Sequence, residues 1–284
     1  MMTLLIARLT LQEAVRRKLV WAVLALSVLF VVLYIYGFQT VVDDVDTFNA
    51  ERGGAPQQLL PRDVQMSIIV MLGLWTVNFL AGVMTIFAAV GAISSEIEAG
   101  TLHVIVTKPL NRFEIIAGKY LGFLTMIVIY ISLMFGSVIV TSRVVGDYTA
   151  PNLLSGLALM ILVSTILLSL TMLGSTIFST MANGVIVFML YGMALTGGLV
   201  EQIGTSLDND TMIRIGVASS VLVPSDSMWK LASYKVQPAI AVSLTGPNPF
   251  GTFVPPSDFA VRYAIFYCLV IVLASMLAFQ RRDL

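Results

Sequence analysis

Six apolar stretches of membrane-spanning length divide the chain, and none of them contains a Lys, Arg, Asp, Glu or His residue. A helix needs roughly 20 apolar residues to cross the hydrocarbon core of a bilayer. The stretches therefore predict an all-α integral membrane protein with six transmembrane helices, in a single transmembrane domain over residues 1–284. They cover residues 20–38, 68–93, 120–141, 153–177, 185–200 and 263–279.

The composition also indicates that lipid surrounds most of the chain. Of its 284 residues, 58% are hydrophobic and 11% are charged, whereas soluble proteins average roughly 45–50% apolar and about 25% charged residues. The net charge is zero, so no basic field indicates nucleic acid as a partner. The single cysteine, Cys268, excludes an internal disulfide and is expected to serve as packing in its apolar run.

Basic residues gather in segments that an even number of crossings places on one side of the membrane. By the positive-inside rule this side is the cytoplasm, so we expect both termini there. Nine of the 16 Lys and Arg residues lie in these segments: Arg8, Arg16, Arg17, Lys18, Lys108, Arg112, Lys119, Arg281 and Arg282. The opposite side receives Asp43, Asp44, Asp46, Glu51, Asp63, Asp208, Asp210, Asp226 and Asp258.

Residues 1–19 are predicted to form an amphipathic cytoplasmic helix. Leu4, Ala7, Leu11, Ala14 and Val15 recur at helical spacing, and polar residues occupy the other side. Such a helix suits the inner membrane interface, with its basic face toward anionic headgroups. The alternative is an ordinary basic flank that sets the topology, and the two readings are compatible.

Two outward-facing segments differ in pattern. Residues 39–65 are polar, contain glycine and proline, and are expected to form a solvated loop. Residues 201–258 form a longer extracytoplasmic segment whose first half has helical patterning, with Ser225-Asp226 as a helix start. Its second half contains five prolines and is expected to be extended and irregular.

The cytoplasmic segment over residues 94–119 predicts a short helix between two spans. Ser95 and Glu98 have the spacing of a capping box, which satisfies free amide groups at a helix start. Gly100 supplies a stop, and Pro109 breaks the chain again. A short capped helix can transmit a push from a partner because it moves as a unit; a well-capped linker without a partner is the alternative.

The sequence contains no evident catalytic centre or energy source. Ion-coupled transporters usually keep an ionisable residue in the membrane, and the six stretches have none. The single histidine, His103, lies in a cytoplasmic loop, and Gly118-Lys119 lacks the other residues of a phosphate-binding loop. We therefore predict that the chain is not an enzyme and holds no metal or cofactor, so it is a passive channel or scaffold or takes energy from a partner.

Several motifs resemble a known transporter family. The segment reads Glu96-Ile97-Glu98-Ala99-Gly100-Thr101-Leu102, then Lys108-Pro109, Arg112 and Gly118-Lys119-Tyr120-Leu121-Gly122. Looser matches are Pro224-x-Asp226 and the final Arg281-Arg282-Asp283-Leu284. Together they resemble the type-2 ATP-binding-cassette (ABC) exporter permeases, in particular the subfamily that includes the nitrous oxide reductase maturation permease. Ala99 and His103 depart from the residues frequent there, which affects the details of partner pairing.

The resemblance implies the permease subunit of an ATP-driven exporter in the inner membrane of a prokaryote. Two permeases, as a homodimer or with a related chain, would bind separate ATPase subunits that carry ATP and Mg²⁺. The short helix would be the coupling helix, and the residues in contact with the ATPase would be Glu96, Ile97, Glu98, Gly100, Thr101, Leu102, Pro109 and Arg112. A membrane scaffold that anchors an ATPase without passing substrate is the alternative function.

Gly118 and Gly122 form a G-x-x-x-G pair, a spacing that permits close approach of another helix. The partner of this pair is either a helix of the same chain or a second permease. The substrate is not specified by any of these residues.

Overall fold

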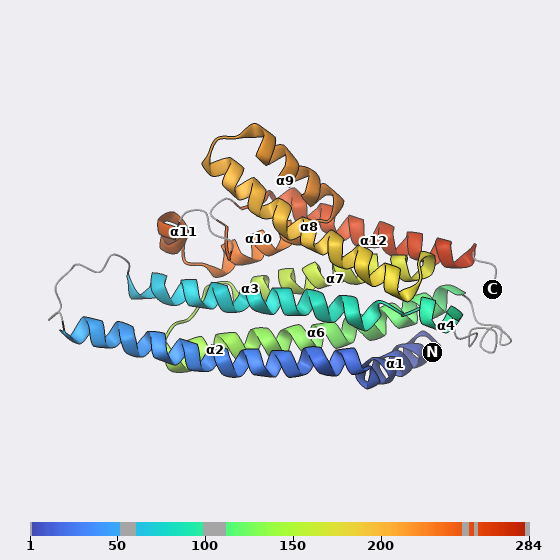
Figure 1. The fold of residues 1–284 in the computed structure, drawn as a ribbon, viewed down its shortest axis with the longest axis horizontal. Coiled ribbons are helices and arrows are strands. Elements are labelled where there is room, and N and C mark those ends of the chain that lie inside the picture. Colours follow the sequence, from blue (N-terminus) through green and yellow to red (C-terminus); the bar gives the residue numbers. More distant parts are fainter. Residues whose placement is uncertain (1, 52–60, 99–111, 246–249, 253–254, 282–284) are drawn as a thin grey trace.

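The computed structural model describes residues 2–51, 61–98, 112–245, 250–252 and 255–281, and their regular structure is helical throughout. Met2–Arg16 form α1, Lys18–Glu51 form α2, Arg62–Ala89 form α3 and Ser94–Glu98 form α4. The chain continues with α6 (Arg112–Val145), α7 (Leu153–Ile177), α8 (Thr180–Ser206), α9 (Asp210–Leu222), α10 (Ser225–Val236), α11 (Ala239–Thr245) and α12 (Asp258–Gln280). Figure 1 shows the long helices side by side along the long axis of the molecule.

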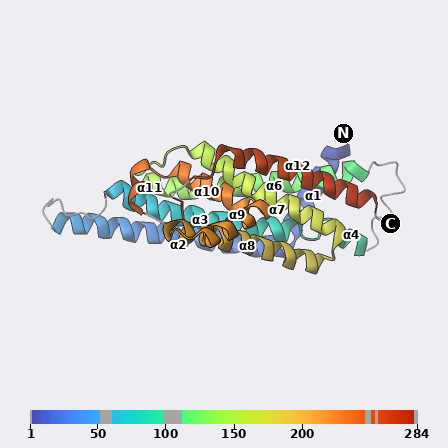
Figure 2. The ribbon, with the colours of Figure 1, turned by 90° about the horizontal axis from the view of Figure 1, so that it is seen from above.

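Six segments are long and apolar enough to cross a membrane, which confirms the predicted all-α fold with six spans. They are Lys18–Thr47, Arg62–Ile97, Phe113–Val145, Leu153–Ile177, Thr180–Ser206 and Phe259–Gln280. The start of α1, the end of α12 and α4 lie at one end of the molecule, as both views show (Figures 1 and 2). The C-terminal end of α2 and the start of α3 lie at the opposite end.

Helix α3 is the central span. In its most apolar 18-residue window 61% of the residues are buried, compared with 22% for α2 and 17% for α12. Two aromatic rings lie directly on its glycines, Tyr34 of α2 on Gly73 and Tyr191 of α8 on Gly82. Small residues let neighbouring helices approach closely where lipid provides no hydrophobic drive for association. The poorly buried α2 and α12 consequently form the outer faces of the bundle.

Some predicted boundaries are wrong because helices continue past the apolar stretches. Helix α2 extends to Glu51, so the first part of the predicted loop 39–65 is helical. Val42 is buried and Val45 packs against the core, and this three-residue spacing continues the buried face of α2. The predicted cytoplasmic segment 94–119 includes the first residues of α6, which starts at Arg112.

The predicted second span, 68–93, lies within the apolar segment Arg62–Ile97, in which α3 stops at Ala89 and residues 90–93 form a turn before α4. The fourth predicted span, 153–177, has the bounds of α7. In the outer segment, α9 and α10 follow the helical patterning of the first half, and α10 starts at Ser225 as expected. The second half is not wholly irregular, since α11 follows Pro238.

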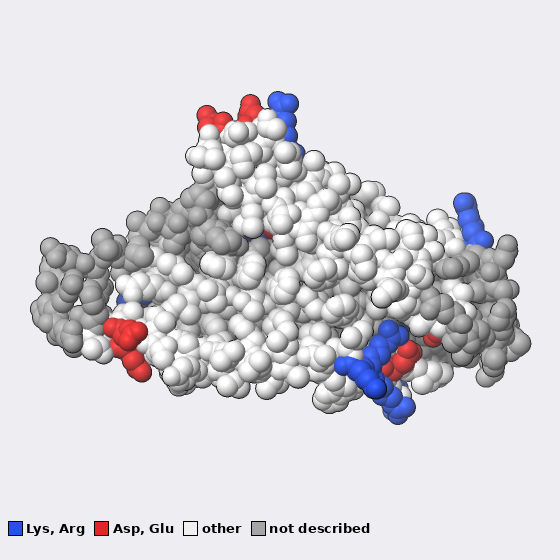
Figure 3. Space-filling view, viewed as in Figure 1, with Lys and Arg blue, Asp and Glu red and all other residues white. Residues whose placement is uncertain are grey.

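Charged side chains are confined to the extremities of the face drawn in Figure 3. Most of the basic residues gather toward the end that carries the N-terminus, acidic residues lie at the opposite end, and residues of both signs lie at the tip of the α8–α9 hairpin. The broad surface between them is uncharged. This distribution is typical of a protein whose middle lies in lipid and whose ends lie in water.

Candidate functional site: the α3–α4 turn and an outer cavity

The turn between α3 and α4 is held by buried polar side chains from two other helices. Where α3 ends, side chains bond to two carbonyl groups of the turn, those of Val90 and Ala92. Asn183 of α8 is fully buried and donates from Nδ2 to the Val90 carbonyl oxygen at 2.8 Å and to that of Thr171 at 3.0 Å. Lys119 of α6 donates to the Ala92 carbonyl oxygen. The turn is therefore fixed to α6, α7 and α8.

Helix α4 itself has two further attachments. The Lys119 Nζ atom lies 2.5 Å from Glu96 Oε1, and the Lys119 side chain is 8% exposed. The Ser94 and Thr180 hydroxyl oxygens lie 2.8 Å apart, which joins α4 to the first turn of α8. Ile97 packs against the hydrophobic core. Because removal of one partner from a buried ion pair leaves an uncompensated charge, the Glu96–Lys119 pair strongly favours this placement of α4.

The predicted capping by Ser95 is wrong. Helix α4 starts at Ser94, so Ser95 is its second residue. The Ser95 hydroxyl donates back to the Gly91 carbonyl oxygen instead of accepting from an amide group ahead of it. The turn that follows α3 satisfies the first amide groups of α4 instead. The Glu96 and Ile97 amides both donate to the Ile93 carbonyl oxygen.

The predicted ATPase contacts are only partly within the described residues. Glu96 and Ile97 lie on α4, and Glu98 is its last residue, with a side chain outside the described part. Gly100, Thr101, Leu102 and Pro109 lie outside the described residues. Arg112 begins α6, and its side chain is outside them too. Glu96, expected to face the partner, forms its ion pair within the chain.

The glycine pair of α6 contacts the N-terminal helix of the same chain. A Cβ atom on Gly118 would meet Ile6 and the Thr3 carbonyl oxygen, and one on Gly122 would meet the Ala7 carbonyl oxygen and Thr10. Ala7, Leu11 and Ala14 of the predicted apolar face are at least partly buried, whereas Leu4 is 72% exposed and Val15 is 44% exposed. In the described chain, close backbone approach at this pair thus brings α1 against α6.

Sequence reasoning missed the roles of Asn183 and Lys119. Residues 178–184 carry no charge, and Lys119 entered the sequence analysis through the topology and the motifs, without an expected partner. One signal was present: Asn183 is a polar residue between two membrane spans, and Gly174 lies directly against its side chain. A side chain on Gly174 would collide with the Asn183 amide, so the glycine makes room for the polar contact.

A second polar cluster lies near the other ends of the spans. Lys230 of α10 forms ion pairs with Glu201 of α8 at 2.8 Å and with Asp226 of α10 at 3.1 Å. The side chains of Lys230 and Asp226 are 6% and 7% exposed, and that of Glu201 is 30% exposed. Gly198 lies against the Asp226 carboxylate, and a Cβ atom there would overlap it.

Burial sets the protonation behaviour of this cluster. Burial raises the pKa of Asp226 to about 6, and the Lys230 ammonium offsets only part of this shift. Burial lowers the pKa of Lys230, but the adjacent Asp226 and Glu201 carboxylates more than compensate, so that its pKa is raised. Lys230 consequently stays cationic at neutral pH. The pKa of Asp226, in contrast, lies only about one unit below neutral pH.

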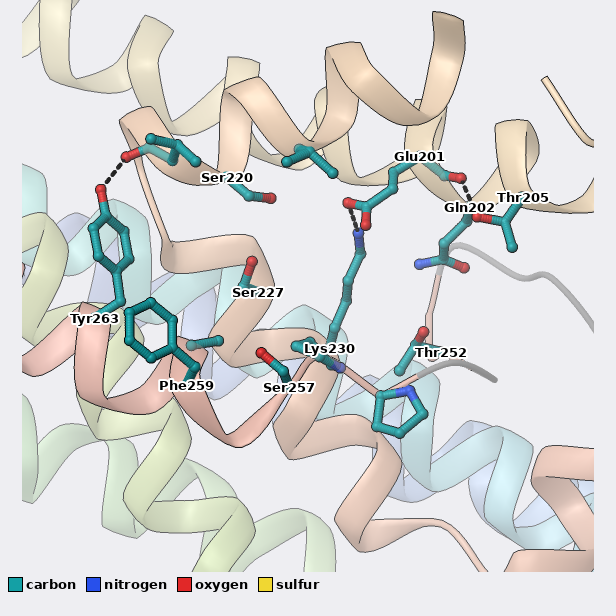
Figure 4. Close-up of a pocket in the computed structure, with 15 residues that line it drawn as sticks. Glu201, Gln202, Thr205, Ser220, Ser227, Lys230, Thr252, Ser257, Phe259 and Tyr263 are labelled. Carbon is teal, nitrogen blue, oxygen red and sulfur yellow. Dashed lines mark hydrogen bonds and ion pairs between the residues drawn. The ribbon is translucent and has the colours of Figure 1, made fainter. Parts of the chain in front are cut away.

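Glu201 and Lys230 of this cluster line a cavity of about 450 Å³ between α8, α9, α10 and the first turns of α12. Figure 4 shows Glu201 and Lys230 pointing toward each other across it, with Phe259 and Tyr263 on the α12 side. Tyr263 and Tyr267 donate to the Val221 and Leu222 carbonyl oxygens at the end of α9. These bonds attach α12 to the α8–α9 hairpin.

The described residues contain no group of three or more His, Cys, Asp and Glu residues that could hold a metal ion. The arrangement is that of a multi-pass membrane protein with a short helix fixed beyond the end of its central span.

A family model described as "ABC-2 family transporter protein" matches residues 4–284. The chain therefore belongs to this family, and it is a membrane subunit of an ABC transporter. A search of curated proteins found no match.

Proposed function

We propose that the chain is the permease subunit of an ATP-driven exporter, which works as a pair of permeases with separate ATPase subunits. The ATPase binds at α4, and ATP and Mg²⁺ reside on that partner. The observation that carries this proposal is the placement of α4: it extends past the end of the central span and is joined to α6 and α8 through Glu96–Lys119 and Ser94–Thr180.

This placement gives a route by which a push on α4 reaches the membrane. The turn at residues 90–93 is bonded to Asn183 and Lys119, so α4 is not free to swing independently of the spans. A displacement of α4 is passed to α3 through the chain, to α6 through Lys119, and to α8 through Asn183 and Thr180. Packed helices with buried polar contacts move as units.

The proposal places the protein in the inner membrane of a prokaryote, with both termini and α4 in the cytoplasm. The basic residues near α1 and α4, and the acidic residues at the opposite end, support this orientation. The resemblance to the nitrous oxide reductase maturation permeases supports the exporter direction and the pairing of two permeases. It does not specify the substrate.

The test is co-purification of the tagged chain from its own cells, with assay of any bound protein for ATP hydrolysis. The structure refines the choice of variant, because Glu96→Ala would also leave Lys119 without its carboxylate. Glu98→Lys reverses a charge at the end of α4 and leaves both partners of that pair in place. The matched control is Asp44→Lys, a charge reversal at an exposed site near the C-terminal end of α2, which lies at the end of the molecule opposite to α4.

We expect the wild type and Asp44→Lys to retain an ATPase in fixed proportion, and Glu98→Lys to lose it or to uncouple its turnover. A wild type that purifies alone under mild conditions would contradict the proposal. An ATPase that binds with turnover unaffected by either substitution would instead favour the scaffold function.

A further inference from the structure

The cavity beside the Glu201–Lys230–Asp226 cluster has the size and lining of a small-molecule site. Its volume of about 450 Å³ lies within the range of roughly 300–1,000 Å³ typical of ligand pockets. Val217 and Val221 of α9, Pro255, and Phe259 of α12 contribute apolar lining. A ligand in this cavity would have an apolar body.

The charge at the polar wall is negative. Glu201 and Lys230 line the cavity, and the buried Asp226 lies outside the lining but approaches the same Lys230 Nζ atom as Glu201 does. Lys230 is the sole Lys or Arg among the residues that line the cavity within the described chain. When all three groups are ionised, one negative charge is left over, and a ligand of positive charge would compensate it.

Glu201 is the carboxylate that the cavity reaches. Its side chain is 30% exposed, whereas that of Asp226 is 7% exposed. Among the described residues, Glu201 pairs with Lys230 through Oε2, and Oε1 has no partner. Figure 4 shows this carboxylate beside the hollow, with the Lys230 ammonium on one oxygen.

A second cation lies near the cavity but outside its lining. The Arg262 guanidinium lies 6.0 Å from the centroid of the Phe259 ring, and the residue is exposed. Solvent and salt screen such an exposed charge more strongly than a partly buried carboxylate. Arg262 therefore does not cancel the attraction of the wall for a cation.

We infer that this cavity binds an amphipathic organic cation, with its ammonium group at Glu201 and its apolar body against Val217, Val221 and Phe259. The inference concerns binding by this chain alone. It does not depend on the partner ATPase, so its failure and the failure of the proposed function are separate results.

The test measures binding to the full chain, purified in an uncharged detergent, by calorimetric titration and by the shift in unfolding temperature. The probe is 2-phenylethylammonium, and its matched controls are 2-phenylethanol, which lacks the charge, and 3-phenylpropionate, which reverses it. We expect saturable binding of the ammonium compound, with binding of the neutral and anionic compounds weaker by roughly tenfold or more, as loss of a charged hydrogen bond implies.

Two variants locate the site. Glu201→Gln keeps the shape of the side chain and removes its charge, and we expect it to weaken ammonium binding by roughly tenfold or more. Asp210→Asn removes an exposed carboxylate that does not line the cavity, and it should bind as the wild type does. Val217→Phe narrows the apolar part without altering the charged cluster, and it should also weaken binding.

The unfolding temperature without ligand shows whether each variant is folded, and Val217→Phe provides a test that leaves the ion pairs intact. The inference is overturned if the neutral alcohol binds as tightly as the ammonium compound. It is equally overturned if Glu201→Gln and Val217→Phe are both folded and bind unchanged, or if the wild type binds none of the three compounds.

Discussion

Asn183 joins two carbonyl groups from different helices in the part of the bundle next to α4. Without its amide, the Val90 and Thr171 carbonyl oxygens lose these donors in a buried setting. We expect Asn183→Ala to lower the free energy of unfolding by about 1–3 kcal/mol. Thermal unfolding in detergent measures the loss, and Gln12→Ala is the control, because it removes an exposed amide side chain on α1.

The neighbouring Gly174 allows a sharper test of the same contact. Gly174→Ala should also lower the free energy of unfolding, by about 1–3 kcal/mol, because the added methyl group collides with the Asn183 amide. In the Asn183→Ala background the methyl group has room, so the cost should largely disappear and the two effects should not add. Additive losses in the double variant would show that the two side chains do not share this space.

Asp226 predicts a dependence of stability on pH. Its pKa in the folded protein is about 6, above the ordinary value of 3.8, so the folded state binds the proton more tightly than the unfolded chain. The contribution of this proton to the free energy of unfolding is complete below the ordinary pKa of 3.8, and it is lost as the pH rises through about 6. The difference of 6 − 3.8, about 2 pKa units, corresponds to at most about 3 kcal/mol.

We therefore expect the unfolding temperature of the wild type to rise as the pH falls from about 7.5 to about 5. Asp226→Asn removes this titration and should show a clearly smaller rise. The groups that face Asp226 are Lys230, Glu201 and Tyr191, and the raised pKa of Lys230 keeps that residue cationic throughout this range. Parallel profiles for the two proteins would show that Asp226 is not the group responsible.

At the scale of elements, the contact between α1 and α6 depends on Gly118. A leucine side chain there would occupy the position of Ile6 and of the Thr3 carbonyl group, so α1 should separate from α6. In a Cys268→Ala background, Thr10→Cys places a thiol at a site that is 5% exposed. We expect this thiol to react slowly with a maleimide, and much faster when Gly118→Leu is added.

Gly136→Leu is the matched control, because it lies on the same helix and an added Cβ atom would have nothing within 4 Å. The control variant should leave the reactivity of Thr10→Cys unchanged. Equal rates in all three proteins would mean that α1 does not depend on this glycine for its position.

Hydropathy predicted the existence of each span better than its ends. The apolar stretch 153–177 matches α7, which ends at Ile177 where the backbone becomes extended at Phe178. The fifth span was predicted to end at residue 200, near Gly197, Gly198 and Glu201, yet α8 continues to Ser206. Its glycines receive Ser219 and Asp226 from α9 and α10, and Lys230 neutralises Glu201. These contacts join segments that are distant in the sequence, so the residues around position 200 do not by themselves indicate that the helix continues.

The candidate site was predictable as a segment but not as a set of contacts. The acidic run and Gly100 indicated a short helix before the third span. The ion pair of Glu96 depends on the packing of α3 against α6, which brings Lys119 to it from 23 positions away (119 − 96). The buried amide of Asn183 likewise depends on the fold of the α7–α8 hairpin.

At the scale of the whole molecule, the sidedness of its charges predicts its orientation. Arg8 lies on exposed α1 at the end with the termini, whereas Asp44 and Asp210 lie on exposed parts of α2 and α9 away from it. We replace each in turn with cysteine in the Cys268→Ala background and treat intact cells with a membrane-impermeant maleimide. We expect the Asp44→Cys and Asp210→Cys proteins to be labelled and the Arg8→Cys protein to be protected.

Permeabilised cells provide the control, since all three cysteines should then react. If Arg8→Cys is protected in intact cells and labelled in permeabilised cells, α1 lies on the inner side of the membrane. Helix α4 then lies on the same side, because α1 and α4 both contact α6 near its start. The opposite pattern of labelling would place α4 outside the cell, where no ATP-driven partner could act on it. Such a result would contradict the proposed ATPase contact without any change to the six-span fold, because orientation depends on the flanking charges and the fold on packing within the membrane.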